Sequence, residues 1–204
     1  MSATSKPDML KSLPLREGKL TIRALRRGDL DILAKWPGYP FPYESFNLSF
    51  GKLGPEERDR SFQSREDDPN KITLVIDHER QKAVGYLSLK EIDWDKREVG
   101  NTGFRIIPSW CDRGLGTQII RKVVGWCFSC GIKKLRFDVA ASNERAIRCY
   151  EKAGFVKTKK FWKDDKKLKE VDINLPKYDF LRPHVKLDGK TPQLSFWWME
   201  LKKE

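Results

Sequence analysis

Residues 113–117 have the sequence Arg-Gly-Leu-Gly-Thr, and residues 143–155 have the sequence Asn-Glu-Arg-Ala-Ile-Arg-Cys-Tyr-Glu-Lys-Ala-Gly-Phe. The first stretch opens an amphipathic helix, so its backbone N–H groups point outward at the positive end of the helix dipole. Gly114 and Gly116 leave room for a phosphate to approach that backbone. In the second stretch, a helix would place Asn143 and Tyr150 about two turns apart on one face. We therefore expect a phosphate-binding turn and a second helix that carries a polar site.

The spacing of apolar residues extends the first helix well beyond the glycine turn. From Gly114 to Gly131 one face is apolar and the other polar, which predicts a long helix that ends at Gly131. The face that we expect to be buried contains Leu115, Ile119, Val123, Cys127 and Cys130.

Runs of β-branched and aromatic residues, separated by turn residues, predict strands in the rest of the chain. We expect strands at 20–24, 72–76, 83–89, 99–107, 135–139, 155–162 and 194–201, and further helices at 28–36, 55–66 and 143–152. The consecutive strands before the glycine turn favour an antiparallel meander, whereas the strand–helix–strand run after it requires a parallel pair. The fold class is therefore α/β, with a mixed, mostly antiparallel sheet flanked by helices. The last strand is apolar on both faces, which predicts a place within the sheet or at an interface.

A loop at 36–50 is rich in aromatic residues, prolines and glycine, a composition that suits neither helix nor strand. Its aromatic residues are Trp36, Tyr39, Phe41, Tyr43, Phe46 and Phe50. Such a loop forms either a wall of a substrate site or a lid on the core, and its composition leaves both interpretations open.

The chain has 204 residues, which is enough for one substantial core. Residues 1–17 are polar and show no periodicity, so we expect a loose or docked N-terminal tail. Residues 18–204 are expected to form a single domain with a charged, proline-broken insertion at about 163–193. Because no long apolar run or signal-like segment is present, we expect a cytoplasmic protein without a membrane partner. We expect a monomer or a homodimer.

The formal net charge of +12 predicts attraction to anions, such as nucleic acid, an acidic protein face or a phosphorylated cofactor. The basic residues are dispersed along the chain and interleaved with acids, which favours a solvated surface. The charge alone does not choose among these partners.

Four cysteines raise the alternative of metal or redox chemistry. Cys127 and Cys130 have the spacing of a redox pair or a zinc half-site, and Cys111 and Cys149 could complete four ligands. However, Cys127 falls on the apolar helix face, and no second pair of this spacing or nearby histidine follows. Buried thiols in a reducing compartment, with no metal, are therefore favoured. His78 and His184 have no motif around them and are interpreted as structural residues.

Four motifs follow one another along the chain: Val84-Gly-Tyr-Leu-Ser, Gly103-Phe-Arg-Ile-Ile-Pro108, the 113–117 turn, and Asn143-x-x-Ala-x-x-x-Tyr150-x-Lys-x-Gly-Phe155. This order resembles the GNAT superfamily of N-acetyltransferases. It is most similar to the branch that includes ribosomal-protein N-terminal and spermidine acetyltransferases. The resemblance covers about 19–162 and the last strand. It implies that acetyl-CoA binds in a V-shaped opening, where a parallel pair of strands splays apart.

The resemblance also implies roles for particular residues. The pantetheine arm would pair with backbone groups of Phe104, Arg105 and Ile106, and would also contact Asn143. The pyrophosphate would be held by the N–H groups of Arg113, Gly114, Leu115, Gly116 and Thr117. Where the family's loop begins with Gln or Arg, this chain has Cys111, followed by Asp112, and Arg113 is expected to compensate.

Transfer to an amine sets two chemical requirements. The amine must be neutral to attack the thioester, so a general base is useful at neutral pH. The leaving CoA thiolate gains from a proton donor, and the resemblance places Tyr150 beside the thioester sulfur. A backbone N–H beside Phe104 or Ile106 could stabilise the developing oxyanion.

The base is harder to assign from the sequence. In this branch a Glu often stands two residues before the glycine–aromatic pair of the strand, and the equivalent residue here is Asn101, which is a poor proton acceptor. We take Glu98 as the first candidate for the base, ahead of Glu44 and Glu91.

The leading hypothesis is an N-acetyltransferase that moves an acetyl group from acetyl-CoA to a protein N-terminus or a small amine. The alternative is a non-catalytic protein of this fold that binds CoA or nucleic acid through its basic surface. The absence of an acid at Asn101 favours the alternative, whereas the presence of Tyr150 and Asn143 favours the enzyme.

Overall fold

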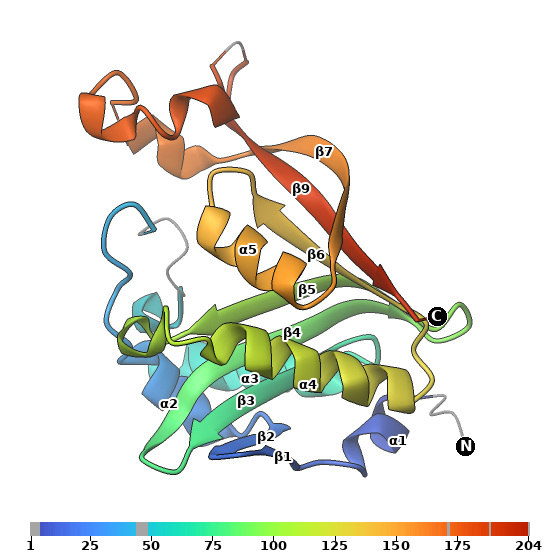
Figure 1. Ribbon diagram of the computed structural model, residues 1–204. Helices are drawn as coiled ribbons and strands as arrows, with labels where there is room; N and C mark the ends of the chain where they lie inside the picture. The colour runs from blue at the N-terminus through green and yellow to red at the C-terminus, as the bar shows by residue number, and fades with distance from the viewer. Residues whose placement is uncertain (1–4, 44–48, 171, 188, 204) are drawn as a thin grey trace. The chain divides into compact units, whose positions relative to one another are not determined.

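The computed structural model describes the chain except for residues 1–4, 44–48, 171, 188 and 204. The chain divides into two compact units, Met1–Leu135 with Lys202–Glu204, and Arg136–Leu201 (Figure 1). Each unit is built around its own strands. The expected division into a tail at 1–17 and one domain at 18–204, with an insertion, stays a prediction.

The N-terminal segment is docked on the first unit and contains regular elements, which its lack of periodicity did not predict. Helix α1 spans Lys6–Leu10, and strand β1 spans Leu15–Glu17. The Lys6 ammonium donates to the carbonyls of Arg65, Glu66 and Asp68 at 2.8, 2.7 and 3.2 Å. Elements of three to five residues are too short to show a helical or strand period, so only their tertiary contacts identify them.

The core of the first unit is an antiparallel meander. Its strands are β2 at Leu20–Ala24, β3 at Ile72–His78, β4 at Gln81–Asp93 and β5 at Glu98–Ile106. They pair in chain order, starting with β1 against β2. The predicted strands and the meander are therefore confirmed. Strands β3 and β4 extend two to four residues beyond the expected bounds, and β5 is shifted by one residue.

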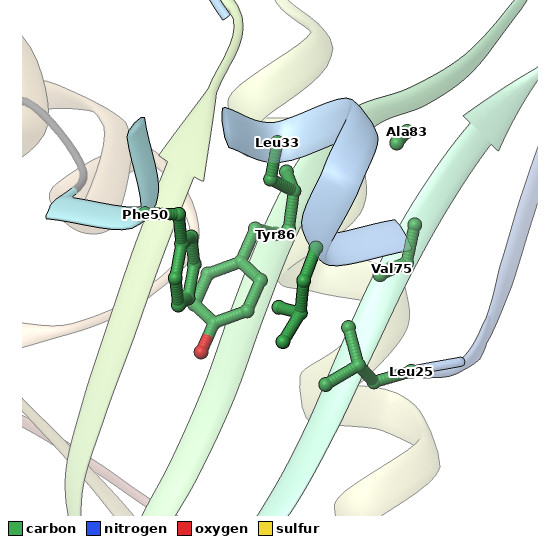
Figure 2. Close-up of a cluster of buried hydrophobic side chains, with 7 residues drawn as sticks. Leu25, Leu33, Phe50, Val75, Ala83 and Tyr86 are labelled. Carbon is green, nitrogen blue, oxygen red and sulfur yellow. The ribbon is translucent and has the colours of Figure 1, made fainter. Parts of the chain in front are cut away.

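Helices α2 and α3 cover one face of this meander. Helix α2 spans Arg27–Ala34, the 3-10 helix η2 spans Ser49–Lys52, and α3 spans Pro55–Asp67. A buried cluster joins α2 and η2 to β3 and β4 (Figure 2); it contains Leu25, Leu30, Leu33, Phe50, Val75, Ala83 and Tyr86. The helix expected at 28–36 begins at Arg27 and ends at Ala34, and Arg26 is its N-cap. The Asp29 carboxylate accepts from the Arg26 N–H at 2.7 Å as a residue of the first turn.

Helix α4 spans Leu115–Ser129 and follows the 3-10 helix η3 at Pro108–Trp110. Figure 1 shows α4 across the front of the meander, with α3 behind it. The expected apolar face is confirmed, and the buried residues within the helix are Leu115, Ile119, Ile120, Val123, Val124, Trp126 and Cys127. The helix ends as expected at Gly131, whose φ of +92° lets the N–H groups of Gly131 and Ile132 reach the carbonyls of Phe128 and Cys127.

The second unit combines one helix with a small sheet. Strand β6 spans Lys134–Ala140, α5 spans Glu144–Lys152, β7 spans Val156–Asp164, β8 spans Val185–Lys186 and β9 spans Gln193–Lys202. Three 3-10 helices lie between β7 and β8: η4 at Lys166–Glu170, η5 at Pro176–Tyr178 and η6 at Arg182–His184. Strand β9 lies between β6 and β7. This confirms the expected interior position of the last strand.

Among the described helices, none is both long and apolar enough to cross a membrane. The four cysteines are free thiols, and the described residues contain no cluster of three or more potential metal ligands.

Candidate functional site

The carboxyl end of β5 carries the first group of predicted site residues. Phe104 and Ile106 are buried. The Ile107 N–H donates to the Val84 carbonyl of β4 at 2.9 Å. Because alternate residues of an antiparallel strand direct their peptide groups to opposite edges, the N–H and C=O of Ile106 face away from β4. These two groups are therefore available to partners on the outer edge of the strand.

Side chains of the first unit contact this outer edge. The Tyr39 hydroxyl donates to the Ile106 carbonyl and accepts from the Ile106 N–H at 3.3 Å. The Arg105 guanidinium donates to the Phe104 carbonyl at 2.7 Å. The Cys111 thiol lies 3.8 Å from the Ile106 carbonyl, which connects the end of β5 to the start of the glycine-rich loop. The structure thus brings the 104–106 and 111–117 segments together.

The glycine-rich loop enters α4 through a left-handed residue. Gly114 is the N-cap with φ +76°, a conformation that a residue with a Cβ rarely adopts. Asp112 also has positive φ, at 58°. The Arg113 guanidinium lies over the Trp110 ring, 5.6 Å from its centroid. Gly114 has no side chain to cap the helix and the first turn carries no acid, so the N-terminal N–H groups are suited to an external anion.

A pocket lies beside this helix start, with a volume of about 430 Å³. Its lining residues are Glu17, Gly114, Thr117, Gln118, Arg121 and Lys122. The Lys122 ammonium pairs with the Glu17 carboxylate at 3.1 Å. Two cations next to a helix N-terminus make this pocket suited to phosphate groups. Gln118, Arg121 and Lys122 lie outside the apolar face that the periodicity predicts, and the sequence pattern alone does not indicate that they line a pocket.

Asn143 caps α5, in the second unit. Its side-chain oxygen accepts from the Ala146 N–H at 3.1 Å, and its own backbone, with φ −91° and ψ 68°, is not helical. Asn143 is the N-cap, so only Tyr150 of the two lies within the helix, and the expectation that they share one face stays a prediction. The cap is made by the side-chain oxygen of Asn143.

Tyr150 is buried in the second unit and is held by other aromatic rings. Its ring stacks on Phe137 with a centroid distance of 4.2 Å and an interplanar angle of 25°. Phe137 in turn meets Phe155 edge-on at 5.0 Å. Such pairs contribute roughly 0.5–1.5 kcal/mol each beyond simple burial, so the ring has a defined position.

Glu98 lies at the opposite end of β5 from Ile106. At about 3.4 Å per residue, roughly 25 Å of strand separates the two. The Glu98 carboxylate pairs with the Lys134 ammonium at 2.6 Å, so it serves an ion pair at the start of the strand. Glu91 is exposed and lies beside Gly100, near the same end. Glu44 lies outside the described residues. The geometry of the first unit therefore does not bring Glu98 or Glu91 to the glycine-rich loop.

The surroundings of Cys127, His78 and His184 are those of residues that stabilise the fold. Burial raises the pKa of the Cys127 thiol, which keeps it protonated and unreactive. His78 accepts from the Arg80 N–H at 3.1 Å and packs against Trp110. Burial also lowers the pKa of His184, whose Nδ1 lies 3.5 Å from the Ser195 hydroxyl.

The predicted site residues fall within the range that matches a known protein family. A model of the acetyltransferase (GNAT) family matches residues 39–155, which is more than half of the chain. This range contains the end of β5, the glycine-rich loop and the Asn143–Phe155 motif.

Individual proteins with similar sequences include two acetyltransferases. Spermidine N(1)-acetyltransferase of Vibrio cholerae is 27% identical over 151 residues, which cover 68% of this chain and 79% of that enzyme. Aminoglycoside N(6')-acetyltransferase type 1 of Klebsiella pneumoniae is 50% identical over 80 residues, or 36% of this chain and 40% of that enzyme. An uncharacterized protein of Methanocaldococcus jannaschii is 28% identical over 144 residues, and the match covers 71% of this chain but only 29% of that protein.

Among solved structures, spermidine N-acetyltransferase from Vibrio cholerae in complex with CoA and spermine has a TM-score of 0.67 and 18% sequence identity. That match covers 91% of this chain and 96% of the other. The fold is the α/β fold of this family, with a mixed, mostly antiparallel sheet, one parallel pair and flanking helices. The predicted fold class is thereby confirmed, while the splay of the parallel pair stays a prediction.

Proposed function

The chain belongs to the acetyltransferase (GNAT) family, and on that premise we propose that it transfers an acetyl group from acetyl-CoA to a primary amine of a small cationic molecule. The amine is of the polyamine or amino-sugar class. Support comes from the similarity to a spermidine and an aminoglycoside acetyltransferase. A protein N-terminus as acceptor, a monomeric or homodimeric state and a cytoplasmic location stay predictions.

The observation that carries this proposal is the start of α4. Gly114 in the left-handed conformation opens a helix whose first-turn N–H groups have no intrahelical acceptor. Arg121 and Lys122 line the adjacent pocket. We assign the N–H groups of residues 113–117 to the pyrophosphate of CoA, because oriented amides and nearby cations favour a multiply charged anion.

In this proposal, the outward-facing backbone groups of Ile106 hold the pantetheine arm, which Asn143 also contacts. The peptide groups of Arg105 face β4 and are not assigned to that arm. When bound, acetyl-CoA supplies an activated acetyl thioester. The neutral amine nitrogen attacks the thioester carbon, and as the carbon–sulfur bond breaks the Tyr150 hydroxyl donates its proton to the leaving sulfur, whose thiol has a pKa in the region of 8.5. The proton that the amine nitrogen loses passes to solvent, from which Tyr150 regains one. The Phe104 N–H, which by strand alternation also faces away from β4, donates to the acyl oxygen as negative charge develops there. Glu98 is given no role in this scheme, because it is paired with Lys134 at the far end of β5.

The cofactor part of the proposal is tested by calorimetry with two variants of the same helix. Gly116→Val places a branched side chain among the first-turn N–H groups and should weaken acetyl-CoA binding at least tenfold. Gly125→Val is the matched control, because a Cβ at the exposed Gly125 meets no atom within 4 Å. Equal affinities of wild type and Gly116→Val would contradict the phosphate-loop assignment.

The acceptor part is tested by CoA release with a panel of amines. Spermidine, spermine, an aminoglycoside and peptides with free N-termini are compared by kcat/KM. We expect turnover with a polyamine or an aminoglycoside to exceed that with the peptides. Preference for the peptides would replace the proposed acceptor class, and binding of acetyl-CoA without turnover of any amine would favour a non-catalytic role.

A further inference from the structure

One tyrosine hydroxyl satisfies both peptide groups at the end of β5. Tyr39 donates to the Ile106 carbonyl and accepts from the Ile106 N–H at 3.3 Å. Both groups face away from β4, since the neighbouring Ile107 N–H donates to β4. The hydroxyl therefore binds the edge of β5 in the manner of a partner strand, which presents one donor and one acceptor to the same residue.

Tyr39 reaches this position from the aromatic loop that follows α2. The loop is anchored on the same end of the β4–β5 pair, because the Trp36 indole N–H donates to the Ala83 carbonyl at 3.0 Å. Tyr39 is buried, with 7% of its surface exposed, whereas Phe41 two residues later is 46% exposed. The segment thus inserts one phenol into the first unit and leaves the next aromatic ring about half exposed.

We infer that Tyr39 is a residue of the acetyl-CoA site whose hydroxyl must leave Ile106 before the pantetheine arm can bind there. A pantetheine amide also offers one N–H and one C=O, so it competes for the same two hydrogen bonds. This inference rests on the proposed function, in which Ile106 holds that arm. Tyr39 therefore reduces the affinity for acetyl-CoA, because its hydroxyl competes with the pantetheine arm for the two peptide groups of Ile106.

The direction of the effect follows from hydrogen-bond energetics. In Tyr39→Phe the ring still fills its site, but the Ile106 N–H loses the hydroxyl that it donates to, and the Ile106 carbonyl keeps only the weak contact with the Cys111 thiol at 3.8 Å. An unsatisfied buried polar group costs more than a hydrogen bond contributes on average. A ligand that forms these hydrogen bonds removes that cost when it binds, so it should bind Tyr39→Phe more tightly than the wild type. The hydroxyl deletion should tighten acetyl-CoA binding about tenfold, whereas a purely structural tyrosine would leave it unchanged or weaken it.

The experiment compares two ligands and three proteins by calorimetry. Acetyl-CoA contains the pantetheine arm, and adenosine 3',5'-bisphosphate contains phosphates but no such arm. The proteins are the wild type, Tyr39→Phe and the control Trp36→Phe, which loses an anchor of the same segment without touching Ile106. We expect Tyr39→Phe to bind acetyl-CoA about tenfold more tightly and the bisphosphate with unchanged affinity. Trp36→Phe should match the wild type with both ligands.

Two outcomes would overturn the inference while leaving the proposed function intact. One is unchanged or weaker binding of acetyl-CoA by a folded Tyr39→Phe; the other is equal tightening in Trp36→Phe. If Tyr39→Phe does not fold, Tyr39→Leu tests the same hydroxyl with the same expected result. Failure of the wild type to bind either ligand would instead overturn the proposed function, and with it the inference.

Discussion

Arg23 shows how a single side chain can join three elements. Its guanidinium donates to both oxygens of Asp29 in α2, at 2.7 and 2.8 Å, and to Asp77 in β3 at 2.9 Å, while Arg23 itself lies in β2. Burial opposes ionisation of Asp77, but hydrogen bonds from Arg23 and the Ala83 N–H lower its pKa. The hydrogen bond with Asp29 is the largest cause of the raised pKa of Arg23.

Removing Arg23 should therefore destabilise the first unit strongly. We expect Arg23→Met to lower the free energy of unfolding by roughly 3–5 kcal/mol at pH 7, because two buried carboxylates would lose their cation. Arg148→Met is the control, since Arg148 pairs with Glu144 on an exposed surface and should change stability little. Urea denaturation measures both, and similar losses in the two variants would contradict the role of the buried network.

The same network should make stability depend on pH. The lowered pKa of Asp77 means that its ion pair contributes fully above the unfolded value of about 4, and that this contribution is lost as pH falls through the lower folded value. The difference in stability between wild type and Arg23→Met should therefore narrow between pH 7 and pH 3. A constant difference over this range would indicate that packing, and not charge, accounts for the effect.

Tyr150 carries the most specific chemical role in the proposal. If its hydroxyl protonates the leaving thiolate, Tyr150→Phe should lower kcat roughly 10²–10⁴-fold with little change in acetyl-CoA affinity. The stacked contact with Phe137 should survive, because the ring is retained. The measurement is kcat, with chemistry shown to be rate-limiting, together with the affinity. A kcat close to that of the wild type would limit Tyr150 to packing.

At the scale of an element, Asn143 has two candidate roles in α5. It caps the helix through its side-chain oxygen, and the family resemblance gives it a contact with pantetheine. Asn143→Ala should cost about 1 kcal/mol of stability, whereas Asn143→Asp should keep the cap. If the amide nitrogen also binds the cofactor, Asn143→Asp should remain stable but bind acetyl-CoA more weakly. Wild-type affinity in Asn143→Asp would reduce Asn143 to a helix cap.

At the scale of the whole molecule, the two ends of the charged segment between β7 and β9 lie next to each other in the second unit. Asp164 and Gln193 are paired in register, and the Asp165 N–H donates to the Pro192 carbonyl at 2.8 Å. The short strand β8 pairs part of this segment with β9. The segment therefore connects adjacent ends of β7 and β9, while its place as an insertion in a single domain stays a prediction.

Because its ends are adjacent, this insertion can be replaced by a tight turn. We expect a variant with Asn-Gly in place of residues 166–191 to fold and to bind acetyl-CoA with unchanged affinity, since this dipeptide suits a two-residue hairpin. Its preference among amines should change, because the insertion follows the cofactor motifs and is assigned to acceptor selection or subunit contact. A folded variant that has lost acetyl-CoA binding would contradict this assignment.

Sequence patterns were sufficient wherever local physics decides the structure. The period of α4 and its end at Gly131 follow from side-chain spacing and from a backbone conformation that suits glycine. The meander follows from β-branched runs with short connections. The glycine-rich turn at 113–117 was recognisable because its chemistry depends on consecutive backbone groups.

Contacts between distant residues required the folded structure. Nothing in the sequence around Tyr39 indicates that its hydroxyl meets Ile106, because only the packing of the aromatic loop against β5 brings the two together. The ion pair of Glu98 with Lys134 also follows from no local pattern, because it joins the start of β5 to the start of β6. Periodicity specifies which face of an element is buried, but partners that lie tens of residues away depend on how the elements pack.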